Sequence, residues 1–275
     1  MHEGGVRRRR LGGIEGQDRE SLERLAAAGE ADAMISLGFL AQEAGDLNMT
    51  RWWWVRAAER GSADAMLELG ILTWQSGGAR DAVREWFLKA AKGGNAVAMR
   101  ELGHLAYRKR DFDLAREWYL KAADLGESGA MNNLGIMADQ AGDHSIAREW
   151  FLKAAECGDT NAMLTLSKSG DPGEAREWCQ KAADLGEAGG MFNLGILAQE
   201  SGDRDAAREW WLKAAELDRT DAMINLGFFA RDSGDLDAAR EWWLRAAELG
   251  DRRAHGLLGF RDLMRAVIGR RPRGQ

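Results

Sequence analysis

The sequence lacks most of the features that interrupt helices, staple a small domain or cross a membrane. Its 275 residues include only two Pro and two Cys, which leaves long stretches without a helix breaker. Cys157 and Cys179 are too few and too far apart for a disulfide framework or a zinc site, as expected in a reducing compartment. No apolar run approaches the roughly 18–20 residues that a spanning helix needs. We therefore exclude a membrane protein and a disulfide-rich domain.

The charge balance is that of a modestly acidic, soluble chain. Lys and Arg number 38 against 44 Asp and Glu, a formal net charge of −6, and 45% of the residues are hydrophobic. No apolar stretch follows the cluster Arg7–Arg10, so we expect no export signal and a cytoplasmic protein. Arg (30 residues) outnumbers Lys (8 residues), a usage that favours a bacterial source.

Motifs for catalysis are also missing. The sequence contains neither a zinc-binding His-Glu-x-x-His pattern nor a glycine loop that ends in Lys-Ser or Lys-Thr. The four His are His2, His104, His144 and His255. No nucleophile has an obvious base, and we expect both Cys to be inert packing residues. The sequence predicts a protein that is not an enzyme and holds no metal or cofactor.

What the sequence does contain is a regular repeat. Met follows Ala or Gly at steps of 32 residues, with one step of 33 and one of 28, at positions 34, 66, 99, 131, 163, 191 and 223, and His255 holds the eighth place. Leu-Gly follows three residues after the Met in six of the seven copies, and a Trp usually follows after 19. A period of this size indicates a helical solenoid.

Each repeat predicts a helical hairpin. In repeat four, Met131, Leu134 and Ala138 lie at i, i+3 and i+7 of a first helix, helix A. Gly142 and Asp143 then supply a left-handed helix end and an N-cap for helix B. Helix B carries a Trp and an aromatic neighbour, which we expect to fill the core. Because helices of about 12–15 residues are marginal alone, stacked repeats must complete that core.

The outer face of helix B predicts a charged, solvated surface. Glu precedes Lys or Arg by four residues, which is the favourable order for a helical ion pair. The pairs are Glu85–Lys89, Glu117–Lys121, Glu149–Lys153, Glu177–Lys181, Glu209–Lys213 and Glu241–Arg245. Such pairs are screened by salt and mark a solvated helix face.

One stretch shows the repeat in full: it runs Ala115-Arg-Glu-Trp-Tyr-Leu-Lys-Ala-Ala-Asp-Leu-Gly126 and continues as Ala130-Met-Asn-Asn-Leu-Gly135. This pattern, which recurs from about residue 18 to 262, resembles the Sel1-like branch of the tetratricopeptide-repeat superfamily. The resemblance implies an all-α, right-handed α-solenoid of about seven 32-residue helix-turn-helix repeats. It also implies that the A helices line a concave groove that binds a protein or peptide, as in adaptors and scaffolds.

The two ends complete this organisation. We expect a solenoid over residues 18–266, with an N-terminal capping helix at 18–28, seven repeats at 30–250 and a C-terminal capping helix at 252–267. Residues 1–17 and 268–275 are expected to be flexible, Arg-rich tails. Residues 1–13 and 266–275 each carry +3, which leaves −12 for the body of the chain.

In the resembled family, three positions of helix A, spaced i, i+4 and i+7, form the groove wall. With their neighbours, these positions give the candidate partner-binding residues Ile35, Phe39, Leu67, Ile71, Trp74, Arg100, His104, Tyr107, Arg108, Asn132, Ile136, Phe192, Ile196, Ile224, Phe228 and Arg231. They predict a semi-apolar groove. The alternative is that the Ile and Phe side chains only pack against the next repeat.

Repeat three differs chemically from the others. Arg100, His104 and Arg108 lie at i, i+4 and i+8, and Lys109 and Arg110 follow where other repeats have a glycine turn. One hypothesis is a cationic patch for an acidic or phosphorylated partner segment, because Arg can hold carboxylate or phosphate with two hydrogen bonds. The alternative is a solvated charge run that neutralises acidic neighbours.

Repeat five is four residues shorter than the others, and the missing residues fall after Leu166-Ser167. Four residues are close to one helical turn of about 3.6 residues, so the stack can continue. Asp171, Pro172 and Glu174 then predict a strong start for helix B. The shortened helix A is expected to leave either a bend or a notch that shapes a site.

Nucleic acid is the alternative partner. A helical-repeat RNA-binding protein could use the basic third repeat and the Arg-rich tails. However, a groove that follows phosphates should be basic, whereas the body carries −12. We therefore expect a non-catalytic scaffold whose partner is a protein or peptide.

Overall fold

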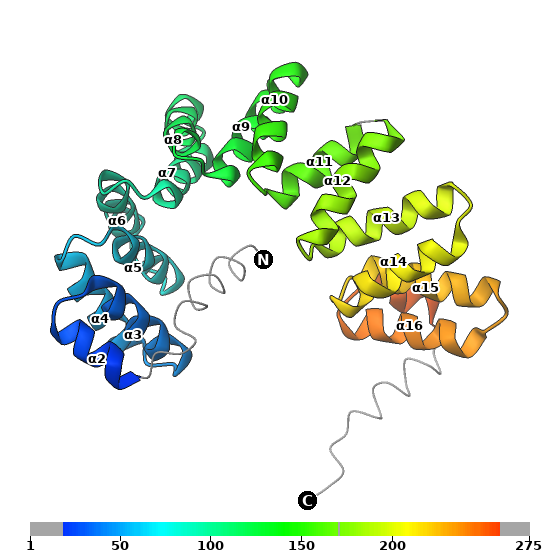
Figure 1. The fold of residues 1–275 in the computed structure, drawn as a ribbon, viewed down its shortest axis with the longest axis horizontal. Helices are drawn as coiled ribbons and strands as arrows, with labels where there is room; N and C mark the ends of the chain where they lie inside the picture. The colour runs from blue at the N-terminus through cyan, green and yellow to red at the C-terminus, as the bar shows by residue number, and fades with distance from the viewer. Residues whose placement is uncertain (1–18, 170, 259–275) are drawn as a thin grey trace, which may run out of the picture. The chain divides into compact units, whose positions relative to one another are not determined.

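The computed structural model describes residues 19–169 and 171–258, in which every regular element is an α-helix. Fourteen of the sixteen described helices alternate as helix A and helix B of the seven repeats (Figure 1). The A helices are α3 (Ala31–Glu43), α5 (Ala63–Gln75), α7 (Ala96–Arg108), α9 (Ser128–Gln140), α11 (Thr160–Ser169), α13 (Ala188–Glu200) and α15 (Thr220–Asp232). The B helices are α4 (Leu47–Glu59), α6 (Arg80–Lys92), α8 (Phe112–Asp124), α10 (His144–Glu156), α12 (Pro172–Asp184), α14 (Arg204–Glu216) and α16 (Leu236–Glu248).

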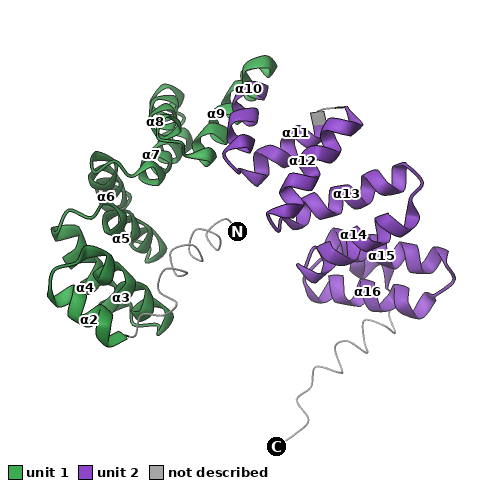
Figure 2. Ribbon diagram, viewed as in Figure 1, with its two compact units in different colours: residues 1–147 green, residues 148–275 purple. Residues whose placement is uncertain are grey.

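The chain forms two compact units, residues 1–147 and 148–275, which divide within α10 (Figure 2). In unit 1, the helices from α2 to α9 pack in chain order, each against the next. In unit 2, the helices from α11 to α17 (Arg252–Leu257) do the same. The predicted all-α solenoid of consecutive helical hairpins is confirmed.

The turn between helix A and helix B is compact because one Asp bonds to both helices: its backbone N–H closes helix A and its carboxylate caps helix B. In repeat one, Gly45 has a φ of 78°, and its N–H donates to the Gln42 carbonyl at 3.0 Å. The Asp46 N–H donates to the Ala41 carbonyl at 2.9 Å, which completes a Schellman motif. The Asp46 carboxylate then accepts from the Met49 N–H at 2.9 Å and caps α4. The same cap is formed by Asp111, Asp203 and Asp235.

Two repeats depart from this turn. In repeat two, residues 76–79 form a loop one residue longer than the three-residue turn of repeat one, which accounts for the step of 33. Its N-cap residue, Ala79, has no side chain that could cap α6. In repeat three, Arg110 takes the glycine position with a φ of 63°, a left-handed conformation that a side chain disfavours.

The glycine of helix A receives the second aromatic residue of helix B. A Cβ atom added at Gly38 would lie 2.2 Å from Trp54 Nε1, and one added at Gly227 would lie 2.1 Å from Trp243 Nε1. Both indole N–H groups donate to helix A carbonyls, Trp54 to Ile35 at 3.2 Å and Trp243 to Ile224 at 3.3 Å. Gly70, Gly103 and Gly195 face Phe87, Tyr119 and Trp211 in the same way. The Leu-Gly signature therefore marks the closest approach of the two helices.

The first aromatic residue of each pair has a different role from the one we expected. Trp86, Trp118 and Trp210 are only half-buried, whereas the second residue of each pair is buried. A cation three residues later lies over the ring, for example Lys89 Nζ at 4.6 Å from the Trp86 centroid. The other five pairs are Trp118–Lys121, Trp150–Lys153, Trp178–Lys181, Trp210–Lys213 and Trp242–Arg245. Among the described residues, only two of the six predicted Glu–Lys pairs form ion pairs: Glu85–Lys89 at 2.8 Å and Glu117–Lys121 at 2.6 Å.

Repeat five keeps its helix B and shortens its helix A. Helix α11 has 10 residues, whereas most A and B helices have 13. Asp171 caps α12 by accepting from the Gly173 and Glu174 N–H groups, with Pro172 in the first turn as predicted. The three missing residues shorten α11 by about 4.5 Å at the rise of an α-helix.

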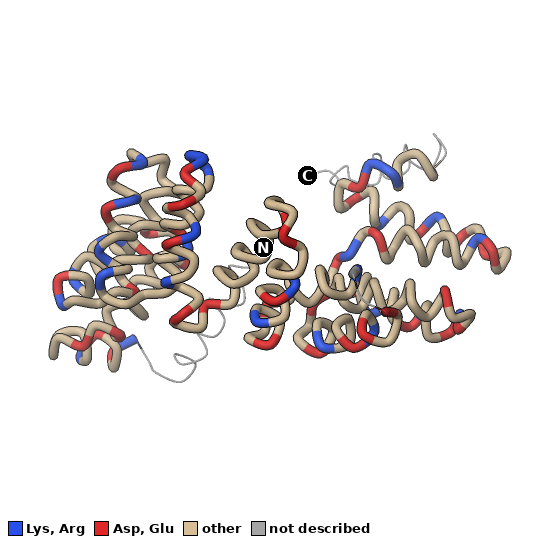
Figure 3. The backbone as a smooth tube through the Cα atoms, turned by 90° about the horizontal axis from the view of Figure 1, so that it is seen from above, with Lys and Arg blue, Asp and Glu red and all other residues tan. Residues whose placement is uncertain are grey.

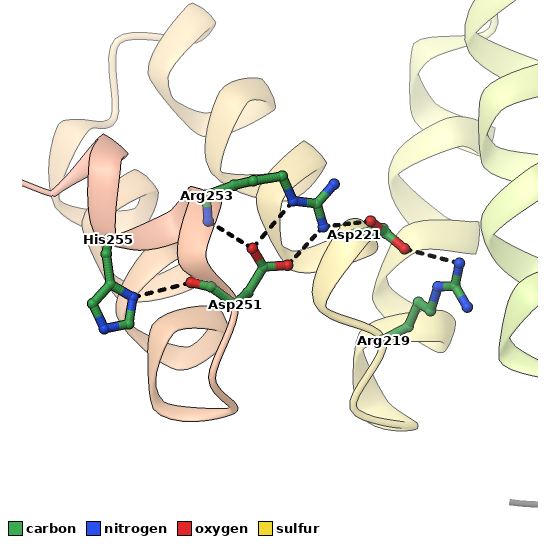
Figure 4. Close-up of polar contacts among 5 residues, drawn as sticks. All are labelled: Arg219, Asp221, Asp251, Arg253 and His255. Atoms are coloured by element: carbon green, nitrogen blue, oxygen red, sulfur yellow. Dashed lines mark hydrogen bonds and ion pairs between the residues drawn. The ribbon is translucent and has the colours of Figure 1, made fainter.

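The solenoid ends in short helices. Helix α2 (Arg19–Ala27) buries Leu22 and Ala26. Helix α17 is capped by Asp251, whose carboxylate accepts from the Arg253 N–H at 2.9 Å (Figure 4). The Arg253 guanidinium bridges this carboxylate, at 2.6 Å, to Asp221 of α15, at 2.5 Å. Helix α17 ends at Leu257; residues 259–267 of the expected capping helix and both expected tails lie outside the described residues.

Candidate partner-binding surfaces

The predicted groove residues all lie on A helices but differ in exposure. Ile35, Phe39, Leu67 and Ile224 are buried and belong to the core, so their side chains support the wall from inside. For these four, packing against neighbouring helices is the role that the structure shows. The half-buried residues are Ile71, Arg100, Tyr107, Asn132, Phe192, Ile196 and Phe228, and the exposed ones are Trp74, His104, Arg108, Ile136 and Arg231.

Repeat three does not gather its cations into one patch. The Arg100 guanidinium lies 2.7 Å from a carboxylate oxygen of Glu101 and 3.8 Å from one of Glu127, the N-cap residue of α9. Its side chain is only 26% exposed. Arg108 lies eight residues along α7, about 12 Å away at the rise of an α-helix. Arg100 is thus neutralised within the chain, while Arg108 stands at the opposite end of the helix.

Arg108 meets a second predicted residue at that end. Its guanidinium carbon lies 5.5 Å from the centroid of Trp74, which is 42% exposed. The preceding residue is Tyr107, whose hydroxyl donates to Gln140 Oε1 at 2.6 Å and whose ring packs edge-on against Phe112 at 5.3 Å. The structure therefore brings Trp74, Tyr107 and Arg108 to one end of the unit 1 hairpins. His104 is exposed in the middle of α7.

Unit 2 contains a pocket of about 460 Å³ between repeats six and seven. Its aromatic walls come from Trp211 of α14 and from Phe228 and Phe229 of α15. Its polar side chains come from Gln199, Arg204, Asn225 and Asp232, and the small residues Gly202 and Ala207 complete the lining. A pocket lined by both aromatic and polar groups is suited to an apolar side chain whose neighbouring backbone is polar.

Cations fix the aromatic rings at this pocket. The Arg204 guanidinium carbon lies 5.1 Å from the Phe229 centroid, and that of Arg231 lies 4.9 Å from Phe228. Arg231 also pairs with Asp232 at 2.9 Å. Phe228 packs edge-on against the core residue Trp243 at 5.5 Å. The pocket wall is therefore braced on both sides, by the core and by the surface cations.

Of the pocket-lining residues, the candidate partner-binding residues include Phe228 but not the aromatic Trp211 and Phe229 or the polar Arg204 and Asn225. Trp211 belongs to the aromatic pairs expected in the core, and it is buried there, at 2% exposure. Phe229 follows Phe228 directly, and a second aromatic residue at this place occurs in no other repeat. That doubling was the available signal. Phe192, predicted on the preceding A helix, instead lies under the Arg219 guanidinium, whose carbon is 5.4 Å from the ring centroid.

The two cysteines behave differently from each other. Cys179 is 1% exposed, and burial raises the pKa of its thiol, which keeps the thiol protonated. Cys157 is exposed directly after the end of α10, so the expectation that it is a packing residue is wrong. It takes a helix-end position that faces solvent. Among the described residues, no group of three His, Cys, Asp or Glu side chains is placed to hold a metal ion.

Family models match most of the repeats. A tetratricopeptide repeat model matches residues 67–130 and 100–162, and another matches 188–213. The Sel1 repeat model matches residues 31–62, 166–187 and 220–251. The chain belongs to the tetratricopeptide and Sel1-like repeat superfamily. Tetratricopeptide and Sel1 repeat proteins generally mediate protein–protein interactions.

Solved structures of repeat proteins share this fold. The Sel1 repeat protein from Oxalobacter formigenes is 22% identical with a TM-score of 0.61; the match covers 73% of this chain and all (100%) of that one. The protective antigen c5321 of uropathogenic Escherichia coli, which displays an SLR fold, is 23% identical with a TM-score of 0.59, over 92% of this chain and 70% of that one. Yeast Tom70 is 15% identical with a TM-score of 0.59, over 94% of this chain and 56% of that one. No curated protein matches the chain in sequence.

Basic and acidic residues are interspersed along the helices of both units (Figure 3). Among the described residues, no helix is long and apolar enough to cross a membrane.

Proposed function

We propose that this repeat protein is a non-catalytic scaffold that binds partner proteins or peptides through the exposed surfaces of its A helices. The pocket beside Phe228 is the observation that supports the proposal most strongly. Phe228, at an A-helix position that the family resemblance assigns to partner binding, lines it together with residues of α13 and α14, so two consecutive repeats build it. An aromatic or aliphatic side chain of a partner would enter it, while Gln199 and Asn225 bind the adjoining backbone.

Binding, as opposed to catalysis, fits the side chains that line the pocket. Gln199 and Asn225 are neutral carboxamides, Arg204 lies over Phe229, and Asp232 is paired with Arg231. Such groups hold and orient a ligand, and the lining includes no nucleophile next to a base. We also propose a cytoplasmic location in a bacterium, which the scarcity of Cys and the excess of Arg over Lys support.

The proposal is tested by filling the pocket without removing a core residue. Gln199 is exposed and lines the pocket, so Gln199→Trp should block it. Asn48→Trp, on the exposed face of α4, is the matched control. Both proteins and the wild type would be immobilised and used to capture proteins from a nuclease-treated lysate of the source organism, with quantification by mass spectrometry.

We expect the wild type and Asn48→Trp to capture at least one protein in equal amounts. Gln199→Trp should capture at least about tenfold less of it, because blocking the pocket of an anchor residue causes a loss of that size. Equal capture by all three proteins would show that the pocket takes no part in partner binding.

A further inference from the structure

One end of the unit 1 hairpins carries cations that the chain itself leaves unneutralised. We call the surface formed by Trp74, Arg80, Arg108, Lys109 and Arg110 the basic edge. All five residues are exposed. In the part of the chain that the structure describes, Arg80, Lys109 and Arg110 have no carboxylate within ion-pair distance, and Arg108 contacts the ring of Trp74.

The topology places these residues together. Helix α5 ends at Gln75, just after Trp74, and α6 begins at Arg80. Helix α7 ends at Arg108, and its turn into α8 holds Lys109 and Arg110. The contact of 5.5 Å between Arg108 and Trp74 joins the ends of α5 and α7 directly. Two consecutive A-to-B turns therefore form one surface.

Several arginines elsewhere in the described residues are used internally, whereas others, such as the exposed Arg51 and Arg116 on B helices, form no ion pair. Ion pairs at 2.5–3.2 Å join Arg100 to Glu101, Arg148 to Glu174, Arg219 to Asp221, Arg245 to Asp218 and Arg253 to Asp221. The basic edge is thus a local excess of positive charge in a protein of net charge −6. Unpaired surface cations steer and hold a partner of opposite charge.

The partner must also present an apolar side chain. Trp74 remains 42% exposed beside Arg108, and Phe112, which packs on Tyr107, is 48% exposed. Large exposed rings next to unpaired Arg side chains form a surface on which an aromatic or aliphatic residue flanked by carboxylates can pack. Arg108 is already held over Trp74, so less of its side-chain freedom is lost on binding.

A short ligand fits better than a long polyanion. The A-to-B turn of repeat one contains Asp46, and that of repeat four contains Asp143, with Asp139 one turn earlier. The turn of repeat three also contains this Asp, as Asp111, but three cations precede it, whereas Ala and Gly precede Asp46 and Asp143. A nucleic acid strand that continued past the basic edge would therefore meet turns without cations to balance their carboxylates. The positive region spans only two turns, which suits a segment with a few acidic residues.

We propose that the basic edge binds a short acidic peptide segment that carries an aromatic or aliphatic residue among its carboxylates. This inference rests on the proposed scaffold function and names the chemistry of one partner segment. The sequence predicts a cationic site along α7 that includes Arg100. Because Arg100 is neutralised, the proposed site lies instead at Arg108 and the turn that follows it.

The test uses the full-length protein and a defined probe. The probe is a fluorescein-labelled peptide with three Glu on each side of a central Phe-Leu pair, measured by fluorescence anisotropy at about 0.15 M salt. A peptide with Gln for every Glu and one with Ser-Ser for Phe-Leu separate the charged and apolar contributions. A decauridylate of the same label reports binding of single-stranded RNA.

The protein variant is Arg108→Glu/Lys109→Glu, and its matched control is Arg51→Glu/Arg116→Glu, which changes the same charge at exposed positions of α4 and α8. Circular dichroism verifies that both remain helical. We expect the basic-edge variant to lose at least about tenfold in affinity for the acidic peptide, and the control less than about twofold, as for rim charges away from the contact. Both substituted peptides should bind more weakly than the probe.

The inference is overturned if the wild type does not bind the acidic peptide, if both variants lose affinity equally, or if decauridylate binds more tightly and depends on the same residues. In each of these cases the scaffold function still stands if the capture of a lysate protein depends on Gln199. If capture does not depend on Gln199 but the acidic peptide still binds, the proposed role of the pocket is wrong and that of the basic edge stands.

Discussion

The glycine in each A helix leaves the space that an aromatic ring occupies. We expect Gly227→Ala to lower the free energy of unfolding by about 1–3 kcal/mol, the usual cost of overpacking a core. The reason is that the new Cβ would lie 2.1 Å from Trp243 Nε1, and Trp243 is only 8% exposed. Urea unfolding monitored by circular dichroism measures the change.

Gly256→Ala is the matched control for this substitution. Gly256 lies within α17, has no positive φ, and a Cβ there would have no neighbour within 4 Å. Ala should therefore be neutral or stabilise by up to about 1 kcal/mol, the difference in helix propensity. Equal effects of the two substitutions would show that the aromatic contact does not set the requirement for glycine.

Arg110 is a residue in a conformation that favours glycine. With a φ of 63°, its side chain crowds the backbone, and Gly at this place forms the turn without that cost. We expect Arg110→Gly to raise the free energy of unfolding by about 1 kcal/mol. Arg110→Ala keeps the unfavourable conformation and should change stability little, so a similar gain in both variants would contradict this explanation.

At the scale of single residues, the sequence predicted the helix ends and the small contact residues but not which aromatic side chain is buried. Trp53 and Trp54 occupy adjacent positions, and both fall on the apolar side of one helix. Trp54 is buried because Gly38 leaves room for it on the facing helix. That selection depends on a contact between residues 16 apart, which helical periodicity does not encode. The cation three residues after the first Trp is the sequence feature that marks the outer ring.

Among the helices, α6 lacks the side-chain cap that Asp gives to most other B helices. Ala79 occupies the N-cap of α6 with a φ of −58° and a ψ of 135°. We expect Ala79→Asp to raise the free energy of unfolding by about 1 kcal/mol, because the carboxylate can accept from a free N–H of the first turn. Ala79→Leu supplies no acceptor and is the control in the same denaturant titration; a gain from Leu as large as that from Asp would argue against capping.

The last described helix should respond to acid. The Arg253 guanidinium holds the pKa of the Asp251 carboxyl well below its usual range, against an opposing contribution from burial. A depressed carboxyl pKa adds stability that is fully present above the ordinary Asp value of about 4 and is lost as the pH falls through the folded pKa. Amide exchange of residues 252–257, corrected for its intrinsic rate, should therefore accelerate below about pH 4.

Asp251→Asn is the control for the acid response, since Asn still caps a helix but carries no charge. Its exchange should be faster than that of the wild type at neutral pH and should change little on acidification. A wild-type protection that stayed constant between neutral and acidic pH would contradict the assigned role of the Asp251–Arg253 pair.

At the scale of helices, the sequence predicted the repeat boundaries well and the surface of helix A less well. The shortened α11 and the start of α12 at Pro172 follow from spacing and capping residues alone. The exposure of each groove candidate does not, because Phe39 and Ile71 hold equivalent positions, five residues after the repeat Met, yet one is buried and the other is half-buried. Neighbouring repeats decide the exposure, and their side chains differ from copy to copy.

The ion pairs show the same limitation. Arg100 and Arg108 share one face of α7 by spacing. The structure distinguishes them because Arg100 pairs with Glu101 and also lies near Glu127 of the next repeat, whereas Arg108 lies over Trp74 of the preceding repeat. Contacts of this kind, between residues about one repeat apart, determine which charges remain free for a partner.

For the whole molecule, each unit offers a distinct surface. Unit 1 presents the basic edge around Trp74, and unit 2 presents the pocket around Phe228. In a repeat protein each repeat contacts mainly its neighbours, so a surface substitution in one unit should leave the other intact. The two surfaces can therefore be inactivated separately and together.

The most direct test of the scaffold function is capture of partners from a lysate by the wild type and by a variant with both surfaces altered, Trp74→Ala/Gln199→Trp. One half of the lysate is treated with nuclease before capture and analysed for proteins by mass spectrometry; the untreated half is analysed for bound RNA and DNA. We predict proteins that the nuclease-treated wild-type sample retains and the variant loses. Recovery of nucleic acid without any protein that depends on these surfaces would contradict the account and support nucleic acid as the ligand.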